Sequence, residues 1–220
     1  MIHSLPHSNT LMDSGYYNNE RRDVASLVPG SAITILDVGC GSGKLGRYLK
    51  SLVPTRVVMG IEFNPAVAAE ARAVLDAVVV GDVAVLELPF EAGYFDCLIC
   101  ADILEHLVDP WTVLRKLKPL LKHDGILLCS IPNIRHYTAF LRLAVHGWEY
   151  TDYGLFDRTH LRFFSLRTMD QLLAQAGYRV FRREPRIIAS MKMKILNTLC
   201  FGHLEEFLTL QYILLARPVP

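Results

Sequence analysis

The chain has 220 residues, of which 51% are hydrophobic and 20% charged, and its net charge at pH 7 is +1. This length favours a single domain over residues 1–220 with a substantial buried core. The near balance of charges excludes the strongly basic or acidic surfaces typical of nucleic-acid or membrane partners, so we expect a small or weakly charged substrate.

Cysteine usage indicates a reducing compartment. The sequence has five cysteines, an odd number, so we expect free thiols and a cytoplasmic protein. Cys97 and Cys100 form a C-x-x-C pattern, but on a strand this spacing sends the side chains to opposite faces, which argues against a metal site there. The N-terminus lacks a basic segment followed by an apolar stretch, and no run reaches ~18 apolar residues, so we expect neither a signal peptide nor a membrane span.

Short apolar strands and amphipathic helices alternate along the chain. Helices are predicted over 16–28, 43–52, 66–77, 111–121 and 165–176, with a further helical stretch over 189–206. Strands are predicted over 33–37, 56–61, 77–80, 94–100, 125–131, 178–182 and 208–216. Because the strands are nearly continuous apolar runs, they are expected to be buried on both faces. The pattern predicts an α/β fold in which helices cover a mostly parallel sheet.

Two segments have two readings each. Residues 134–164 carry eight aromatic side chains in irregular sequence, which is typical of a lid or acceptor pocket, and equally of a satellite core beneath a long loop. In the predicted first helix, Tyr16, Tyr17 and Arg21 either cover a bound ligand or belong to a plain packing helix.

The glycine-rich stretch after the first strand predicts a tight turn into a helix N-terminus. Glycine lets the backbone approach a ligand closely, and the helix start offers unpaired N–H groups. Residues 41–46 match the dinucleotide pattern G-x-G-x-x-G, but there the first glycine directly follows the strand. In this sequence that glycine is Gly39, so the third glycine of the pattern would fall at position 44, which is occupied by Lys44. A phosphate-binding loop ending at Lys44 would need glycine at Val38 and a hydroxyl at Leu45.

Acidic residues close the next strands. Glu62 follows the second strand, Asp82 the third and Asp102 the fourth. The carboxyl ends of strands in an open α/β sheet line one crevice, so these residues are expected to share a site with the glycine turn. A carboxylate accepts from vicinal ribose hydroxyls or an exocyclic amine, and the glycine backbone suits an amino acid end. The set predicts a nucleoside ligand with an amino acid tail.

These segments together resemble the class I S-adenosylmethionine-dependent methyltransferases. The stretch L-D-V-G-C-G-S-G is similar to the first motif of that family, G-I-E-F-N-P to the second, V-G-D to the third, F-D-C-L-I-C-A-D-I-L-E-H-L to the fourth and D-G-I-L-L-C-S-I-P-N to the fifth. The resemblance covers residues 16–181. It implies a doubly wound, Rossmann-like sheet of seven strands, mostly parallel, with an antiparallel last strand.

The resemblance also implies where S-adenosylmethionine binds. It assigns residues to the methionine part (Asp37, Gly39, Gly41, Gly43), to ribose and adenine (Glu62, Phe63), to adenine (Asp82, Val83) and, through backbone, to the sulfonium (Ala101).

The candidate base for the transfer lies in D-I-L-E-H, where a helical turn would gather Asp102, Glu105 and His106. We take His106 as the base, assisted by His160. The pattern is similar to E-x-x-E-H of some ubiquinone-pathway and small-RNA ribose O-methyltransferases, which helps to hold a divalent metal. With aspartate in place of the first glutamate, we favour a metal-free base or a structural polar pair over a metal site.

Residues 154–164 indicate the class of acceptor, because they resemble the acceptor-side region of methyltransferases of glycan and natural-product pathways. A sugar or another small polar metabolite is expected, methylated on a hydroxyl or amine, with Arg158, His160 and Arg162 as contacts. The alternative there is a buried ion network with Asp157. Two other functions are weighed: a nicotinamide-dependent oxidoreductase, and a non-catalytic cofactor-binding subunit of a larger assembly. A homo-oligomer is compatible with the sequence.

Overall fold

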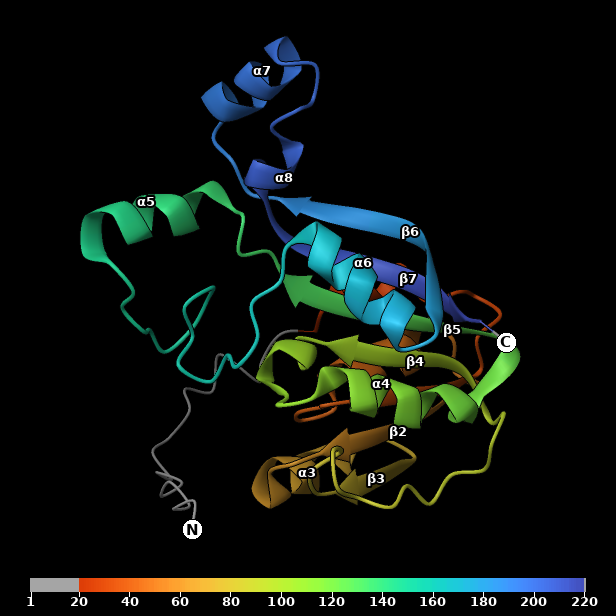
Figure 1. The fold of residues 1–220 in the computed structure, drawn as a ribbon. Coiled ribbons are helices and arrows are strands. Elements are labelled where there is room, and N and C mark those ends of the chain that lie inside the picture. Colours follow the sequence, from red (N-terminus) through yellow and green to blue (C-terminus); the bar gives the residue numbers. More distant parts are fainter. Residues whose placement is uncertain (1–19, 220) are drawn as a thin grey trace.

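The computed structural model describes residues 20–219 and shows one seven-stranded sheet in the order β3-β2-β1-β4-β5-β7-β6 (Figure 1). The strands are β1 (Thr34–Val38), β2 (Val57–Glu62), β3 (Ala77–Val80), β4 (Phe95–Ala101), β5 (Leu121–Pro132), β6 (Tyr178–Ile187) and β7 (Thr209–Pro218). The first five pair in parallel, while β7 runs antiparallel to both of its neighbours. The predicted doubly wound sheet with an antiparallel last strand is confirmed.

Helices cover both faces of this sheet. The longer ones are α2 (Lys44–Leu52), α3 (Pro65–Ala71), α4 (Pro110–Leu117), α5 (Tyr137–His146), α6 (Leu166–Gln175) and α7 (Met191–Leu199), and α1 (Arg22–Ala25) and α8 (Glu205–Leu208) are single turns. Buried side chains of α4 and α6 join the core on one face, and those of α1, α2 and α3 join the core on the other. Cys97 belongs to one core and Cys100 to the other, so the predicted opposite orientation of this pair is confirmed.

Local sequence explains where several helices begin and end. Asn64 caps α3 by accepting from the N–H of Ala66, and Pro65 occupies the first turn, where a missing N–H costs nothing. The predicted helix 111–121 ends at Leu117, and the turn around Pro119 continues as a 3-10 helix over Lys118–Leu120.

Other bounds differ from the prediction. The helix expected over 16–28 is observed only as α1, and residues 16–19 lie outside the described part of the chain. Segment 134–164, expected to be irregular, contains α5. The helical stretch 189–206 is divided into α7 and α8 by a turn at Phe201 and Gly202, whose φ angles are both positive. Within residues 20–219, no helix is long and apolar enough to cross a membrane.

Candidate active site

The glycine turn joins β1 to α2 and lies at the carboxyl edge of the sheet. Gly39, Gly41 and Gly43 all have positive φ, so the chain turns sharply before α2 begins. The N–H of Gly39 donates to the carbonyl of Ile61 on the neighbouring strand at 2.8 Å. At Gly43, an added Cβ would lie 2.7 Å from Val74, which leaves no room for a side chain.

Glu62 ties this turn to the end of β2. One carboxylate oxygen accepts from the N–H of Gly41 at 2.9 Å and the other from the N–H of Asn64 at 2.8 Å. Each oxygen therefore keeps a lone pair for a further donor. The N–H of Gly81 donates to the carbonyl of Glu62, so the end of β3 lies against the same residue. The structure brings together the first three predicted strand ends.

Asp37, the one acidic residue of β1 (Thr34–Val38), is only 2% exposed. Burial and the nearby charge of Glu62 raise the pKa of the Asp37 carboxyl to about 7. A carboxyl that loses its proton near neutrality favours a ligand bearing a positive charge, because that charge compensates for the burial of the anion.

The remaining predicted cofactor residues lie around this edge with different exposure. Phe63 follows Glu62 and is 62% exposed, so its ring is accessible to a flat ligand. Asp82 accepts from the N–H of Ala84, and Val83 beside it is buried. Ala101 ends β4 and is partly buried.

Asp102, directly after β4, is the centre of a polar network that the sequence did not predict. Its carboxylate accepts from Arg21, from the hydroxyl of Ser130 at 3.0 Å and from the amide of Gln211. The guanidinium of Arg21 also donates to Ser130 at 2.9 Å and to Asp23 at 3.1 Å. Burial lowers the pKa of Arg21, but the charges of Asp102 and Asp23 outweigh it and the pKa is raised. The network fixes the N-terminal segment to the end of β4.

A second group follows Asp102. Leu104–His106 forms a 3-10 turn, and ligand atoms of Glu105, His106 and His160 lie within 4.8 Å of one another. The rings of His106 and His160 meet edge to face, with centroids 4.7 Å apart. The two histidines expected to act together are in contact, their catalytic roles stay predictions, and Asp102 is not in the group. The prediction that Asp102, Glu105 and His106 gather on one helical turn is corrected in this respect, since Asp102 has a left-handed backbone (φ 55°) and its carboxylate is engaged by the network around Arg21.

Both imidazoles are anchored through Nδ1. Nδ1 of His106 lies 3.2 Å from the carbonyl of Thr159, and Nδ1 of His160 lies 3.4 Å from the carbonyl of Leu155. A carbonyl can only accept, so these contacts favour the tautomer with a proton on Nδ1 and a lone pair on Nε2. Burial lowers the pKa of both rings, and the adjacent His160 lowers that of His106 further. Both side chains are therefore suited to accept a proton near neutrality.

Glu105 is buried, and neither side-chain oxygen has a hydrogen-bond partner among residues 20–219. Burial and the charge of Asp102 raise its pKa well above the ordinary value. Its backbone carbonyl accepts from the N–H groups of Leu161 and Arg162, which holds the segment around His160 against this turn.

Aromatic rings lie beside the histidines. Trp148 packs edge to face on Phe156 and on Phe163, with ring centroids 5.0 Å and 4.9 Å apart. The ring centroids of Phe163 and His160 are 6.3 Å apart. Phe156 is buried, while Trp148 is 44% exposed, so segment 134–164 combines a small core with an accessible ring. The buried Phe156 and its ring contacts agree with a small core in this segment, while its role as a lid or acceptor pocket stays a prediction.

The expected acceptor contacts Arg158 and Arg162 have other partners. Arg158 pairs with Asp152, and Arg162 donates to the carbonyl of Val108 and lies over the ring of Trp111. The alternative ion network with Asp157 is not observed among the described ion pairs, and Asp157 instead accepts from the N–H and hydroxyl of Thr159.

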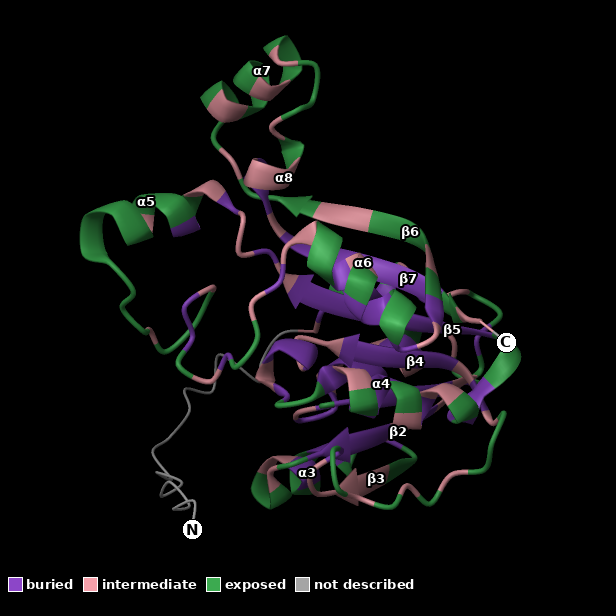
Figure 2. Cartoon of the chain, in the orientation of Figure 1, coloured by how far each residue is buried: buried purple, intermediate pink, exposed green. Residues whose placement is uncertain are grey.

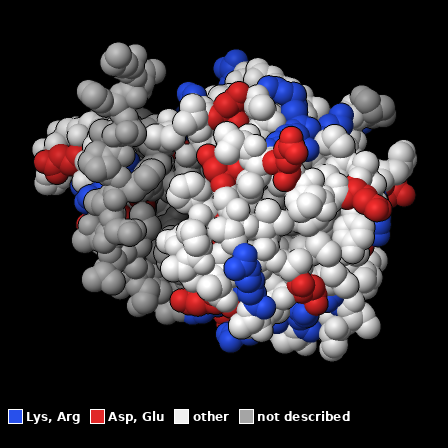
Figure 3. All heavy atoms as spheres, turned by 90° about the horizontal axis from the view of Figure 1, so that it is seen from below, with Lys and Arg blue, Asp and Glu red and all other residues white. Residues whose placement is uncertain are grey.

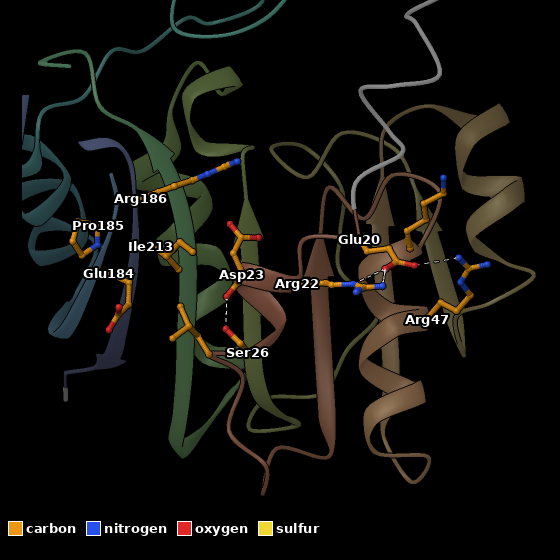
Figure 4. A pocket seen from close by; sticks show the side chains of 11 residues that line it. Glu20, Arg22, Asp23, Ser26, Arg47, Glu184, Pro185, Arg186 and Ile213 are labelled. Atoms are coloured by element: carbon orange, nitrogen blue, oxygen red, sulfur yellow. Dashed lines mark hydrogen bonds and ion pairs between the residues drawn. The ribbon is translucent and has the colours of Figure 1, made fainter. Parts of the chain in front are cut away.

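A cavity of about 770 Å³ lies elsewhere, between α1, α2 and the strands β6 and β7 (Figure 4). Three of its charged lining residues pair with one another: Glu20 binds Arg22 at 2.8 Å and Arg47 at 3.8 Å. The cavity contains neither the glycine turn nor the histidines, so its size does not identify the site. On the face shown in Figure 3, basic and acidic side chains are interspersed without a large patch of one sign.

Comparisons with known proteins show the family of this chain. A family model described as a methyltransferase domain matches residues 14–182. The ubiquinone biosynthesis O-methyltransferase of Dinoroseobacter shibae is 34% identical over 168 residues, covering 71% of this chain and 64% of that protein. The protein of the same name from Xanthomonas axonopodis is 37% identical over 131 residues, covering 57% and 53%. The chain thus spans between half and two thirds of the length of these relatives.

Solved structures share the fold. A methyltransferase dependent on S-adenosylmethionine from Archaeoglobus fulgidus superposes with a TM-score of 0.66 at 17% identity, covering 90% of this chain and 94% of that one. One from Thermotoga maritima gives 0.64 at 19% identity, covering 92% and 89%. The chain belongs to the methyltransferase domain family. The resemblance to class I S-adenosylmethionine-dependent methyltransferases, and with it the expected cofactor, is confirmed.

Proposed function

We propose that this chain transfers a methyl group from S-adenosylmethionine to a hydroxyl of a small metabolite. The observation that carries the proposal is the bridge made by Glu62, whose carboxylate joins the glycine turn to the end of β2 beside the buried Asp37. This places two carboxylates, a narrow glycine turn and an accessible Phe63 ring along one edge, as a nucleoside with an amino acid tail requires.

The residues present fit this cofactor. Asp37, with its pKa near 7, matches the ammonium of the methionine part, and the lone pairs left on Glu62 match the ribose hydroxyls. Gly43 has no room for a side chain, and this keeps the turn close-packed below the ligand. The cofactor supplies an electrophilic methyl group on its sulfonium.

His106 is proposed as the general base. As the acceptor oxygen bonds to the methyl carbon and the carbon–sulfur bond breaks, Nε2 of His106 accepts the hydroxyl proton. The contact of Nδ1 with the carbonyl of Thr159 holds the ring in the required tautomer, and His160 packs against its edge. Alignment of acceptor and methyl group supplies much of the rate enhancement, because in-line displacement depends on geometry.

The acceptor proposed is a planar aromatic alcohol. Phe163 lies beside His160, and Trp148, which packs on Phe163 and is 44% exposed, offers an accessible ring to such a molecule. The curated relatives are named for ubiquinone biosynthesis, which agrees with this class. The sugar acceptor expected from residues 154–164 is the competing prediction.

A second candidate adds a divalent cation. The environment of Glu105 supports this candidate, because both of its buried carboxyl oxygens lack a partner among the described residues and two imidazoles lie within ligand distance. One carboxylate and two histidines are a donor set that divalent metals accept. Bound there, the cation would supply positive charge that makes the acceptor hydroxyl more acidic. Removing metal with a chelator decides between the two: turnover persists with a metal-free base, and with the second candidate it is lost and restored by an added divalent transition metal such as Mn²⁺, Co²⁺ or Zn²⁺.

The test of the main proposal is calorimetric titration with S-adenosylmethionine, its demethylated product and NADH, followed by a turnover assay with 3,4-dihydroxybenzoate and with a pool of sugars. Binding of the first two ligands and release of the demethylated product in the presence of an acceptor are expected. Binding of NADH alone would support an oxidoreductase. Cofactor binding without turnover on any acceptor would support a non-catalytic subunit.

A further inference from the structure

The segment 188–204, here called the α7 arm, presents apolar side chains to solvent. Met191, Ile195 and Leu199 follow one another at intervals of four residues, which places them on one face of α7. Their exposed fractions are 71%, 54% and 71%. The less exposed residues, Met193 and Asn197, are on the other side of the helix.

The inner side of α7 is already held. The N–H groups of Leu204 and Gly202 donate to the side chain and the carbonyl of Asn197, so the chain after the helix folds back under it. The apolar stripe therefore faces outward, the reverse of an ordinary surface helix, whose apolar side faces the core. No residue of α7 is buried, and Figure 2 shows the helix largely green and pink, clear of the sheet.

Phe201 extends this surface at the turn after α7. It has a left-handed backbone (φ 53°), which is uncommon for a bulky residue, and its side chain is 91% exposed. A phenylalanine held outward on such a backbone adds the largest exposed apolar group of the arm.

The charges of the arm have one sign. Lys192 and Lys194 are both exposed and flank the stripe on its two sides, and residues 188–204 contain no aspartate or glutamate. Long lysine side chains extend from an apolar boundary towards anionic groups while their stems remain in apolar contact. The overall charge of +1 conceals this local excess.

The position of the arm separates it from the methyltransferase core. It lies outside residues 14–182, the part that matches the family model. It leaves the sheet after the carboxyl end of β6, the edge at which the glycine turn and histidines lie (Figure 1). At the same edge, α5 exposes further apolar residues. The ring of its Phe140 packs on that of Phe207 in α8, with centroids 5.9 Å apart.

We propose that the α7 arm docks on the surface of an anionic lipid bilayer, with the apolar stripe and Phe201 at the boundary of headgroups and acyl chains. A short helix with an outward apolar face, flanking lysines and no acid is typical of a helix that lies in the membrane interface. A second copy of the chain would bring Lys192 and Lys194 towards like charges of an identical arm, which disfavours a symmetric contact. The proposal does not depend on the proposed reaction.

The test is co-sedimentation of the full chain with vesicles of phosphatidylcholine containing about one third phosphatidylglycerol, and with vesicles of phosphatidylcholine alone. Binding to the anionic vesicles that weakens as salt is raised is expected. Lys192→Gln with Lys194→Gln should lower that partition coefficient about 30-fold, from ~1 kcal/mol per lysine. It should leave the weak binding to neutral vesicles unchanged.

Leu199→Glu should lower binding about tenfold or more, since it places a charge in the apolar boundary. Leu52→Glu is the matched control, because Leu52 is an exposed leucine at the end of α2, away from the arm, and it should bind as wild type. Circular dichroism confirms that both variants fold. The proposal is overturned if wild type does not sediment with anionic vesicles, if both leucine variants bind equally, or if Leu199→Glu instead dissociates a wild-type dimer that ignores vesicles.

Discussion

The guanidinium of Arg21 and the carboxylate of Asp102, 81 positions apart in the chain, form an ion pair at the end of β4. Both residues have left-handed backbones, with φ angles of 44° and 55°, although neither is glycine. Backbone conformations of this kind persist where surrounding contacts enforce them, and they occur often at functional sites. The pair fastens the segment before α1 over the edge at which the cofactor is proposed to bind.

Replacing Arg21 by alanine is expected to lower the free energy of unfolding by about 2 kcal/mol, because it leaves Asp102 without its charged partner. Urea unfolding measures this. The double variant Arg21→Ala, Asp102→Asn should lose less than the sum of the single variants, by about 1 kcal/mol. Arg22→Ala is the control: that side chain is exposed and pairs with Glu20, so a loss within about 0.5 kcal/mol is expected. Strict additivity of the two substitutions would contradict the pairing.

Cofactor affinity should depend on pH through Asp37. Since burial and Glu62 raise its pKa to about 7, the carboxyl is mainly protonated at pH 6 and mainly ionised at pH 8. The ionised form binds the ammonium of the cofactor, so Kd should fall about tenfold as pH rises from 6 to 8. Calorimetry measures Kd at each pH.

Without cofactor, the same raised pKa has the opposite consequence for stability. The protonated carboxyl is preferred in the folded state, so its contribution is full below the unfolded-state pKa near 4 and is lost as pH rises through 7. Asp37→Asn should remove both dependences. A Kd that varies with pH in this variant as in wild type would show that another group titrates.

Replacing His106 by alanine should lower turnover about 100-fold or more while Kd for the cofactor changes little, because a general base acts on the acceptor. Single-turnover assays and calorimetry separate the two effects. His123→Ala provides the control, since His123 is exposed and pairs with Asp124 next to it in the chain. Unchanged turnover in the His106 variant would remove the base from this position.

Gly43→Ala tests the packing of the glycine turn. Alanine there must adopt a positive φ and place its Cβ 2.7 Å from Val74 and 3.2 Å from the backbone of Ala71. Gly93→Ala has a similar φ of 68° but meets nothing within 4 Å, so it measures the backbone cost alone. We expect thermal unfolding to show a loss larger by about 1–3 kcal/mol for the Gly43 variant. Equal losses of stability in the two variants would mean that the turn accommodates a Cβ at position 43 without a clash.

The sheet could be predicted from the sequence because each buried strand is a short apolar run and the intervening helices are amphipathic. The direction of β7, by contrast, came from family resemblance. His106 and His160 could be named as a working pair from the sequence, and their rings lie in contact. The network around Asp102 could not be foreseen, because Arg21, Ser130 and Gln211 come from three distant segments and the left-handed backbones of Arg21 and Asp102 depend on tertiary contacts. From the sequence, the aromatic cluster around Trp148 could be recognised only as a high content of aromatic residues in segment 134–164.

The connection 188–208, which contains the α7 arm and α8, is closed by a hydrogen bond from the N–H of Ile188 to the carbonyl of Leu208, immediately where β6 pairs with β7. These two strands are antiparallel neighbours, so everything between them is a loop inserted into a hairpin. Such a connection can be exchanged for a short turn without altering strand order or register. Shortening this connection would remove the α7 arm and leave the strand order unchanged, provided that Ile188 and α8 are kept, because His136 contacts the carbonyl of Ile188 and Asn133 donates to the carbonyl of Glu206.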